Sequence, residues 1–130
     1  MFEPVPLNLP PQPFKIVQAD GALYIFDGLR KKRLLLTPEE WVRQHFVSYL
    51  IQEKKYPKSL IKLEGGLKIN QAQSRTDILV FAKDGLPFIL VECKACTVKI
   101  DQKVFDQAAR YNILHRVKYL MVSNGLDHYC

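Results

Sequence analysis

The stretch TDILVFAKDGLPFILVECKA, residues 76–95, decides how the rest of the chain is interpreted. Two apolar runs flank an Asp-Gly turn signal at 84–85, a pattern typical of an antiparallel β-hairpin. Three charged residues interrupt these runs: Asp77 in the first, and Glu92 and Lys94 in the second. Buried charges cost several kcal/mol unless they are compensated, so their presence in the hairpin needs a physical reason.

The position of the turn predicts the pairing of the two acids. The midpoint of positions 77 and 92 falls between 84 and 85, so Asp77 should lie almost opposite Glu92. Side chains alternate between the faces of a strand, so Glu92 and Lys94 should project from one face. Two carboxylates directly opposed on a sheet repel each other. A divalent cation bound between them would remove that repulsion.

The three charged residues fit metal-assisted hydrolysis of a phosphodiester. Two carboxylates, a backbone carbonyl and water oxygens form a hard-ligand set that suits Mg²⁺. A lysine beside the metal can stabilise developing negative charge or orient the attacking water. The alternative is that Asp77 is a surface residue at the start of a strand, and that Glu92 and Lys94 pair where the second strand frays into a loop.

The chain as a whole is predicted to be one domain of 130 residues in three parts. These parts are a Pro-rich arm over 1–13, an N-terminal β-hairpin and strand over 14–36, and a core over 37–124. The core has the order α-β-β-β-α-β, with a polar loop at 70–74 before the opening hairpin. An Asn-Gly turn signal at 124–125 then favours a further strand, so either that strand is short or the chain is a truncation of a longer protein.

The first predicted helix has clear ends and carries two acids. Thr37 is its N-cap, Pro38 takes the first helical position, Glu40 completes a capping box and Pro57 stops the helix. At about 100° per residue, Glu39 projects near the centre of the apolar face, whereas Glu40 lies off it. Since Glu40 already has a role in the cap, Glu39 is the better candidate for an active-site acid.

The second predicted helix also has polar residues on its apolar side. Gln107 and Tyr111 are i and i+4, hence neighbours on the helix surface. Both fall in the stripe formed by Ile100, Val104 and Leu114. A buried Gln needs hydrogen-bond partners, so Gln107 either belongs to the site or lies at the edge of the stripe, bonded to Tyr111 or water.

Composition sets the broad class of the protein. Lys and Arg total 19 against 13 acids, a net charge of +6 that is compatible with nucleic acid. The basic run at 30–33 would contact phosphate or form a solvated turn. We find no apolar run long enough to span a membrane and no secretory signal. Three Cys, with C-x-x-C at 93–96 lacking a second pair for zinc, indicate free thiols in a reducing cytoplasm.

The motifs together resemble the PD-(D/E)XK nuclease superfamily. A helical Glu, a strand, an Asp, a Glu-x-Lys and a helical Gln-x-x-x-Tyr follow in that order. RTDILVF, LVECKA and FDQAARYN are most similar to the nuclease domain at the N-terminus of type I restriction enzyme R subunits and its stand-alone relatives. The resemblance covers roughly residues 37–124. Thr76 stands where the family has its name-giving Pro, a position that varies within the superfamily.

The resemblance implies a restriction-endonuclease-like α/β fold, an αβββαβ core with a central mixed sheet. Asp77 and Glu92 would bind Mg²⁺, with Mn²⁺ as a substitute, helped by the carbonyl of Cys93. Lys94 would be the catalytic lysine. The supporting residues would be Gln107, Tyr111 and the first-helix acid, which is Glu39 with Glu40 as the second claimant. The chain has no GxxxxGK[ST] loop, so no nucleotide cofactor is expected.

These observations predict a cytoplasmic Mg²⁺-dependent DNA endonuclease domain. A DNA-binding or assembly module that keeps the fold without catalysis is the alternative, and a plain structural domain is a third. The sequence leaves open whether DNA or RNA is cut. It also leaves open whether the domain works alone, as a homodimer or with a partner subunit.

Overall fold

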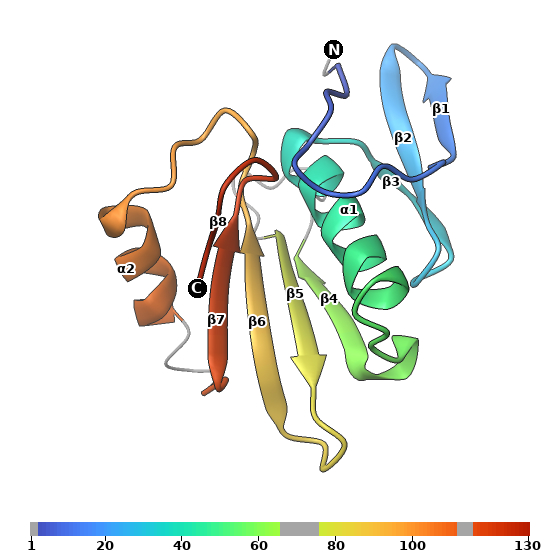
Figure 1. Cartoon of the computed structure of the whole chain (residues 1–130). Helices are drawn as coiled ribbons and strands as arrows, with labels where there is room; N and C mark the ends of the chain where they lie inside the picture. Colours follow the sequence, from blue (N-terminus) through green and yellow to red (C-terminus); the bar gives the residue numbers. More distant parts are fainter. Residues whose placement is uncertain (1–2, 66–75, 112–115) are drawn as a thin grey trace.

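The structure is a computed structural model that describes residues 3–65, 76–111 and 116–130. Its described part holds two β-sheets and two α-helices, so the protein is of the α/β class (Figure 1). In chain order the elements are β1 (Ile16–Ala19), β2 (Ala22–Asp27), β3 (Lys32–Leu35), α1 (Pro38–Gln52), the short 3-10 helix η1 (Lys58–Leu60), β4 (Ile61–Gly65), β5 (Thr76–Phe81), β6 (Pro87–Cys93), α2 (Gln102–Tyr111), β7 (Tyr119–Ser123) and β8 (His128–Tyr129).

The main sheet has the order β4-β5-β6-β7-β8 and is mixed. Neighbouring strands are antiparallel except β6 and β7, which are parallel. Parallel strands need a crossover connection, and α2 lies in it. The predicted order α-β-β-β-α-β and the mixed sheet are therefore confirmed. The further strand expected after the turn at 124–125 is the two-residue β8.

The predicted N-terminal hairpin and the strand after it are confirmed. β1, β2 and β3 form a separate antiparallel sheet. Asp20 and Gly21, between β1 and β2, both have positive φ, 49° and 76°. Two consecutive residues of positive φ are the requirement of the type I′ turn that suits the twist of a hairpin. The Asp-Gly pair therefore sets the register of this sheet.

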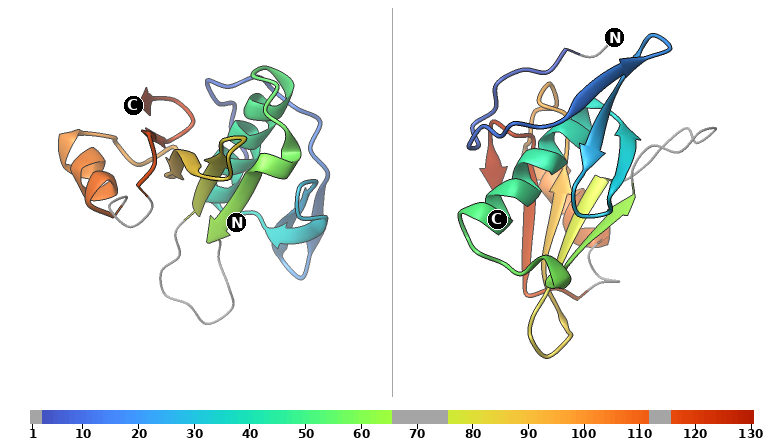
Figure 2. Two further views of the ribbon diagram at one scale, coloured as in Figure 1. Left: turned by 90° about the horizontal axis from the view of Figure 1, so that it is seen from below. Right: turned by 90° about the vertical axis from the view of Figure 1, so that its right-hand side faces the viewer.

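The two helices cover opposite faces of the main sheet (Figure 2). On one face, Val42 and Phe46 of α1 pack with Ile78 of β5 and Val91 of β6. On the other face, a smaller cluster centres on Ala108 of α2 with its neighbours Ile100 and Val122. Strand alternation explains the division, because neighbouring residues of a strand point to opposite faces.

The first helix ends earlier than predicted, at Gln52 and not at Pro57. Lys55 adopts a left-handed conformation with φ 61°, and the N–H of Tyr56 donates to the carbonyl of Leu50 over 3.0 Å. A left-handed residue is a common way to end a helix. Pro57 therefore follows the turn that ends the helix. The loop expected at 70–74 lies outside the described residues.

The Pro-rich arm has no regular structure over residues 3–15, as predicted, and it is tied to both ends of the core. The indole N–H of Trp41 donates to the carbonyl of Val5 over 2.8 Å. The backbone N–H of Asn8 donates to the carbonyl of Gly125, in the turn between β7 and β8, over 2.7 Å. The arm thus packs against α1 and the β7–β8 turn together.

Gly125→Ala is expected to destabilise the protein by loosening this arm. A Cβ at position 125 would lie 2.8 Å from Cδ2 of Leu7 and 3.2 Å from Cγ2 of Val42, and φ there is +86°. Gly85→Ala is the matched control, because its φ is +84° but no heavy atom lies within 4 Å of the added Cβ. Overpacking should cost Gly125→Ala about 1–3 kcal/mol more than the control. Equal losses in urea denaturation would show that the arm contact contributes nothing.

Candidate active site

The two acids of the central hairpin lie directly opposite each other. Asp77 on β5 pairs in register with Glu92 on β6, and both are buried, with 2% and 4% of their surfaces exposed. A bulge between Val80 and Phe81 shifts the register near the turn but leaves this pairing in place. The predicted register is confirmed. The alternative of a surface Asp77 is wrong.

Lys94 follows the last residue of β6 and lies beside Glu92. Its Nζ is 3.2 Å from Oε2 of Glu92, and its side chain is 34% exposed. The backbone N–H of Lys94 donates to the carbonyl of Ser123 on β7 over 2.8 Å. This bond continues the β6–β7 pairing past the end of β6, so the chain does not fray at this point. The lysine therefore presents a cation to solvent from an ordered strand end.

A buried ionic cluster occupies the first turns of α1. Arg43 is fully buried and holds Glu40 with two nitrogens, Nε to Oε2 over 2.9 Å and Nη2 to Oε1 over 2.5 Å. The side-chain amide of Gln44 donates to Oε2 of the same glutamate over 2.8 Å. Both carboxylate oxygens of Glu40 are thus engaged. A two-point contact between arginine and carboxylate is among the stronger hydrogen-bonded pairs in proteins.

The expectation that Glu40 lies off the buried face of the first helix is wrong. Glu40 is 3% exposed, whereas Glu39 is only partly buried. Thr37 does cap the helix, accepting the N–H of Glu40 over 3.0 Å, but the Glu40 carboxylate turns to Arg43 and not back to the cap. Residues 42–47 are all buried, so α1 is covered on several sides and the apolar stripe marks only one of them. A role for Glu39 in catalysis stays a prediction.

The cluster on α1 reaches the acid pair. Nη1 of Arg43 lies 3.5 Å from the main-chain carbonyl oxygen of Asp77. Burial raises the pKa of the Cys93 thiol, the positive charge of Arg43 lowers it, and the charges of Asp77, Glu40 and Glu92 raise it further. Since its raised pKa keeps that thiol protonated, its sulfur is a poor metal ligand.

The second helix does not place Gln107 as expected. The apolar stripe that packs toward the sheet holds Val104, Phe105 and Ala108 of α2, with Ile100 just before the helix. Gln107 is exposed on α2, outside that stripe, so the expectation of a buried Gln is wrong. Tyr111 is the last residue of α2, and its side chain lies outside the described part of the chain, as does Leu114.

The backbone register adds an acid that the sequence patterns did not single out. Glu64 on β4 is the register partner of Asp77 on β5, which in turn is the partner of Glu92 on β6. Three adjacent strands therefore place an acid in one row across the main sheet. Residues 66–75 separate β4 from β5 along the chain. No short sequence motif could therefore have indicated that Glu64 is the partner of Asp77.

The basic run at 30–33 is divided between a structural and an exposed part. Nε of Arg30 contacts Oδ2 of Asp27 over 2.8 Å. Burial raises the pKa of Asp27, but hydrogen bonds and charge from Arg30 and the N–H of Leu29 outweigh it and leave the pKa below its usual value. Arg30 is thus used by the fold. The remaining three residues of the run, 31–33, are exposed, and contact between them and phosphate stays a prediction.

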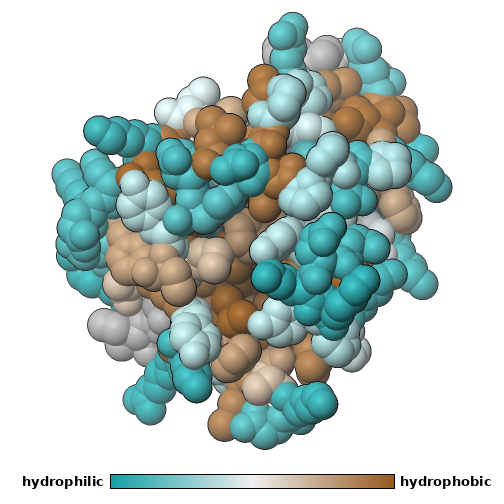
Figure 3. All heavy atoms as spheres, in the orientation of Figure 1, coloured by the Kyte–Doolittle hydropathy of each residue, from teal (hydrophilic) through white to brown (hydrophobic). Residues whose placement is uncertain are grey.

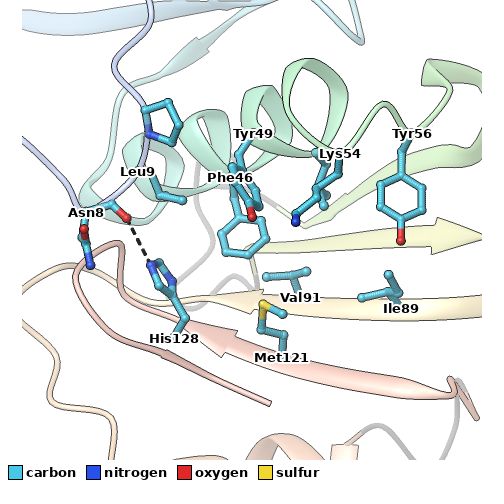
Figure 4. Close-up of a pocket in the computed structure, with 12 residues that line it drawn as sticks. Asn8, Leu9, Phe46, Tyr49, Lys54, Tyr56, Ile89, Val91, Met121 and His128 are labelled. Atoms are coloured by element: carbon cyan, nitrogen blue, oxygen red, sulfur yellow. Dashed lines mark hydrogen bonds between the residues drawn. The ribbon is translucent and has the colours of Figure 1, made fainter.

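An apolar cavity of about 500 Å³ lies on the α1 face of the sheet, where apolar atoms surround a hollow in the surface (Figure 3). Aromatic rings of Phe46 and Tyr49 face Val91 and Met121 across it, and Lys54 reaches in from the end of α1 (Figure 4). No acid lines it. Val91 and Glu92 are adjacent in β6 and point to opposite faces, so this cavity is separate from the acid pair.

The described part of the chain thus defines an α/β domain with a mixed sheet and a buried, opposed pair of acids on two of its central strands. Residues 38–130 match the sequence model of the family described as Type I restriction enzyme R protein N terminus (HSDR_N). The chain belongs to this family, as the resemblance had predicted. No curated protein and no solved structure matches it.

The described residues hold neither a membrane-spanning helix nor a cluster of metal-ligating side chains. None of the helices there combines the length and apolar character that crossing a membrane requires. Among the side chains described, no three His, Cys, Asp or Glu residues lie together in a group that could hold a metal ion.

Proposed function

We propose that this protein is a metal-dependent DNA endonuclease domain that hydrolyses phosphodiester bonds. The observation that carries the proposal is the direct opposition of two buried carboxylates, Asp77 and Glu92, with the ammonium of Lys94 3.2 Å from Glu92. Membership of the family named for type I restriction enzymes supports the choice of DNA. A net charge of +6 supports it as well, because neutralising phosphates dominates affinity for DNA.

The donor set at the acid pair fits a hard divalent cation. Asp77 and Glu92 would hold Mg²⁺ or Mn²⁺ with the main-chain carbonyl of Cys93. Bound there, the ion would polarise a phosphoryl oxygen and acidify a water molecule. The fold proposed with this role is the restriction-endonuclease-like core, supported by the order α-β-β-β-α-β and by the mixed sheet.

The remaining residues have roles that follow from where they lie. Lys94 is partly exposed beside Glu92, so its ammonium can meet the scissile phosphate and stabilise the charge that builds on it. Gln107 is exposed on α2, a position that favours a contact with DNA over support of the metal. Glu39, partly buried near the start of α1, is proposed as a further polar group of the site.

Metal binding is the first test of this proposal. Mn²⁺ at a hundred times its Kd is expected to stabilise the wild-type protein by about 2.7 kcal/mol, because the ion binds only the folded state. Asp77→Asn should lose this stabilisation, since it removes one of the two carboxylates. Asp84→Asn is the matched control, because Asp84 is exposed in the turn of the same hairpin. Thermal unfolding with and without Mn²⁺ measures both effects.

Cleavage of supercoiled plasmid with Mg²⁺ or Mn²⁺ is the second test. Turnover that is lost in Asp77→Asn and kept in Asp84→Asn is the expected result. Salt-sensitive DNA binding that survives Asp77→Asn, without turnover in any form of the protein, would instead indicate a non-catalytic DNA-binding module. No cleavage and no Mn²⁺ binding by the wild-type protein would overturn the proposal.

A further inference from the structure

We propose that Arg43 is a positioning residue of the acid pair, and that Glu40 serves as its counter-ion. The guanidinium would fix the main chain at Asp77 and so hold the Asp77 carboxylate at its distance from Glu92. This inference rests on the proposed metal site. It concerns a residue that touches neither the metal nor the scissile phosphate in that proposal.

The burial of Arg43 means that its charge interacts with groups inside the protein. No part of Arg43 is exposed. Arginine is almost never fully buried unless it is paired, and Glu40 supplies the pair through contacts of 2.9 and 2.5 Å. Because Arg43 and Gln44 engage both oxygens of Glu40, the glutamate would have to give up these bonds to hold a cation. Glu40 therefore orients the guanidinium of Arg43.

The third nitrogen of the guanidinium links the helix to the site. Nε and Nη2 face Glu40, and Nη1 lies 3.5 Å from the carbonyl oxygen of Asp77. The guanidinium is planar, so fixing two nitrogens on the helix also fixes where the third one lies. The carbonyl and the carboxylate of Asp77 share one Cα, and a shift of that main chain would move the carboxylate relative to Glu92.

Arg43 supports Asp77 from its main-chain side, with Nη1 3.5 Å from the carbonyl oxygen. Groups that orient a metal ligand from behind typically change metal affinity or activity by about 10–100-fold when they are altered. Arg43, carried by α1, lies behind Asp77 in this way.

The test uses Arg43→Lys, which keeps the positive charge and loses the planar fork. With the intact protein, the expected result is a Kd for Mn²⁺ weaker by about 10–100-fold. The kcat for plasmid cleavage should fall while KM for DNA stays unchanged. Arg116→Lys is the matched control, because Arg116 is exposed between α2 and β7 and has no part in the proposed site. A folded Arg43→Lys protein with an unchanged Kd for Mn²⁺ would overturn the proposal and leave Arg43 a stabilising residue only.

A second measurement is independent of metal and separates this proposal from the proposed function. Amide hydrogen exchange at residues 77–79, measured without metal, should become several-fold faster in Arg43→Lys and stay unchanged in Arg116→Lys. If the wild-type protein binds no Mn²⁺, the proposed function fails, and the exchange at 77–79 still decides the role of Arg43. Unchanged exchange there would overturn that role. Should Arg43→Lys not fold, the double variant Glu40→Leu/Arg43→Met replaces the ion pair with apolar side chains of similar length and is measured in the same way.

Discussion

Lys94→Ala is expected to reduce plasmid cleavage by about 10²–10³-fold, the usual loss when one group that stabilises transition-state charge is removed. The ammonium of Lys94 lies at the acid pair within reach of solvent, with 34% of its side chain exposed and Nζ 3.2 Å from Glu92. Negative charge that grows on the phosphate would meet it there. Cleavage rates at saturating Mg²⁺ measure the effect.

The same substitution should leave the fold nearly intact. A partly exposed ion pair contributes about 0–1 kcal/mol, and the bond from the N–H of Lys94 to Ser123 belongs to the main chain. Lys83→Ala is the matched control, since Lys83 is exposed near the turn of the same hairpin. Wild-type cleavage by Lys94→Ala would remove the lysine from the mechanism. Equal losses in both variants would indicate a general loss of charge attraction for DNA.

Glu40→Ala is expected to lower the free energy of unfolding by about 3–5 kcal/mol, the usual cost of leaving one member of a buried ion pair without its partner. Arg43 has no exposed surface, so its charge cannot be hydrated once the carboxylate is gone. Gln44 would lose its acceptor as well. Denaturation by urea, followed by circular dichroism, measures the change.

The neighbouring acid provides the control for this prediction. Glu39 is partly buried, and Glu39→Ala should change stability far less, within about 0.5 kcal/mol for a site without such a network. The double variant Glu40→Leu/Arg43→Met should recover much of the loss, because a well-packed apolar pair often replaces a buried ion pair without cost. Equal destabilisation by Glu39→Ala and Glu40→Ala would contradict the buried cluster.

Local chemistry explains the parts of the fold that could be predicted. The Asp-Gly turns at 20–21 and 84–85 depend on residues that tolerate positive φ. The first helix starts where the side chain of Thr37 caps it and the ring of Pro38 takes the first helical position. The register of Asp77 with Glu92 follows from the position of the second turn and from the two-residue period of strands. The family of the chain could be identified from the same motifs, because they are short and contiguous.

The errors have a shared physical origin. The helical projection ranked Glu39 above Glu40 because it used the apolar stripe alone, and it had no means to find a buried Arg43. It also placed Gln107 on the buried stripe of α2, where the structure has Ala108. Hydrophobic periodicity detects burial that is driven by apolar area. Burial of a polar side chain depends on a partner, and that partner is known only once the elements are packed.

The sequence by itself determined the elements, the turns, the pairing of Asp77 with Glu92 and the family. The tertiary structure decided which acid of α1 is buried, that Arg43 contacts Asp77, and that Glu64 joins the same row of the sheet. The physical reason is the range of the interactions. Turns, caps and hairpin register involve residues close along the chain, whereas the contact of Arg43 with Asp77 spans 34 positions and forms only when helix and sheet pack together.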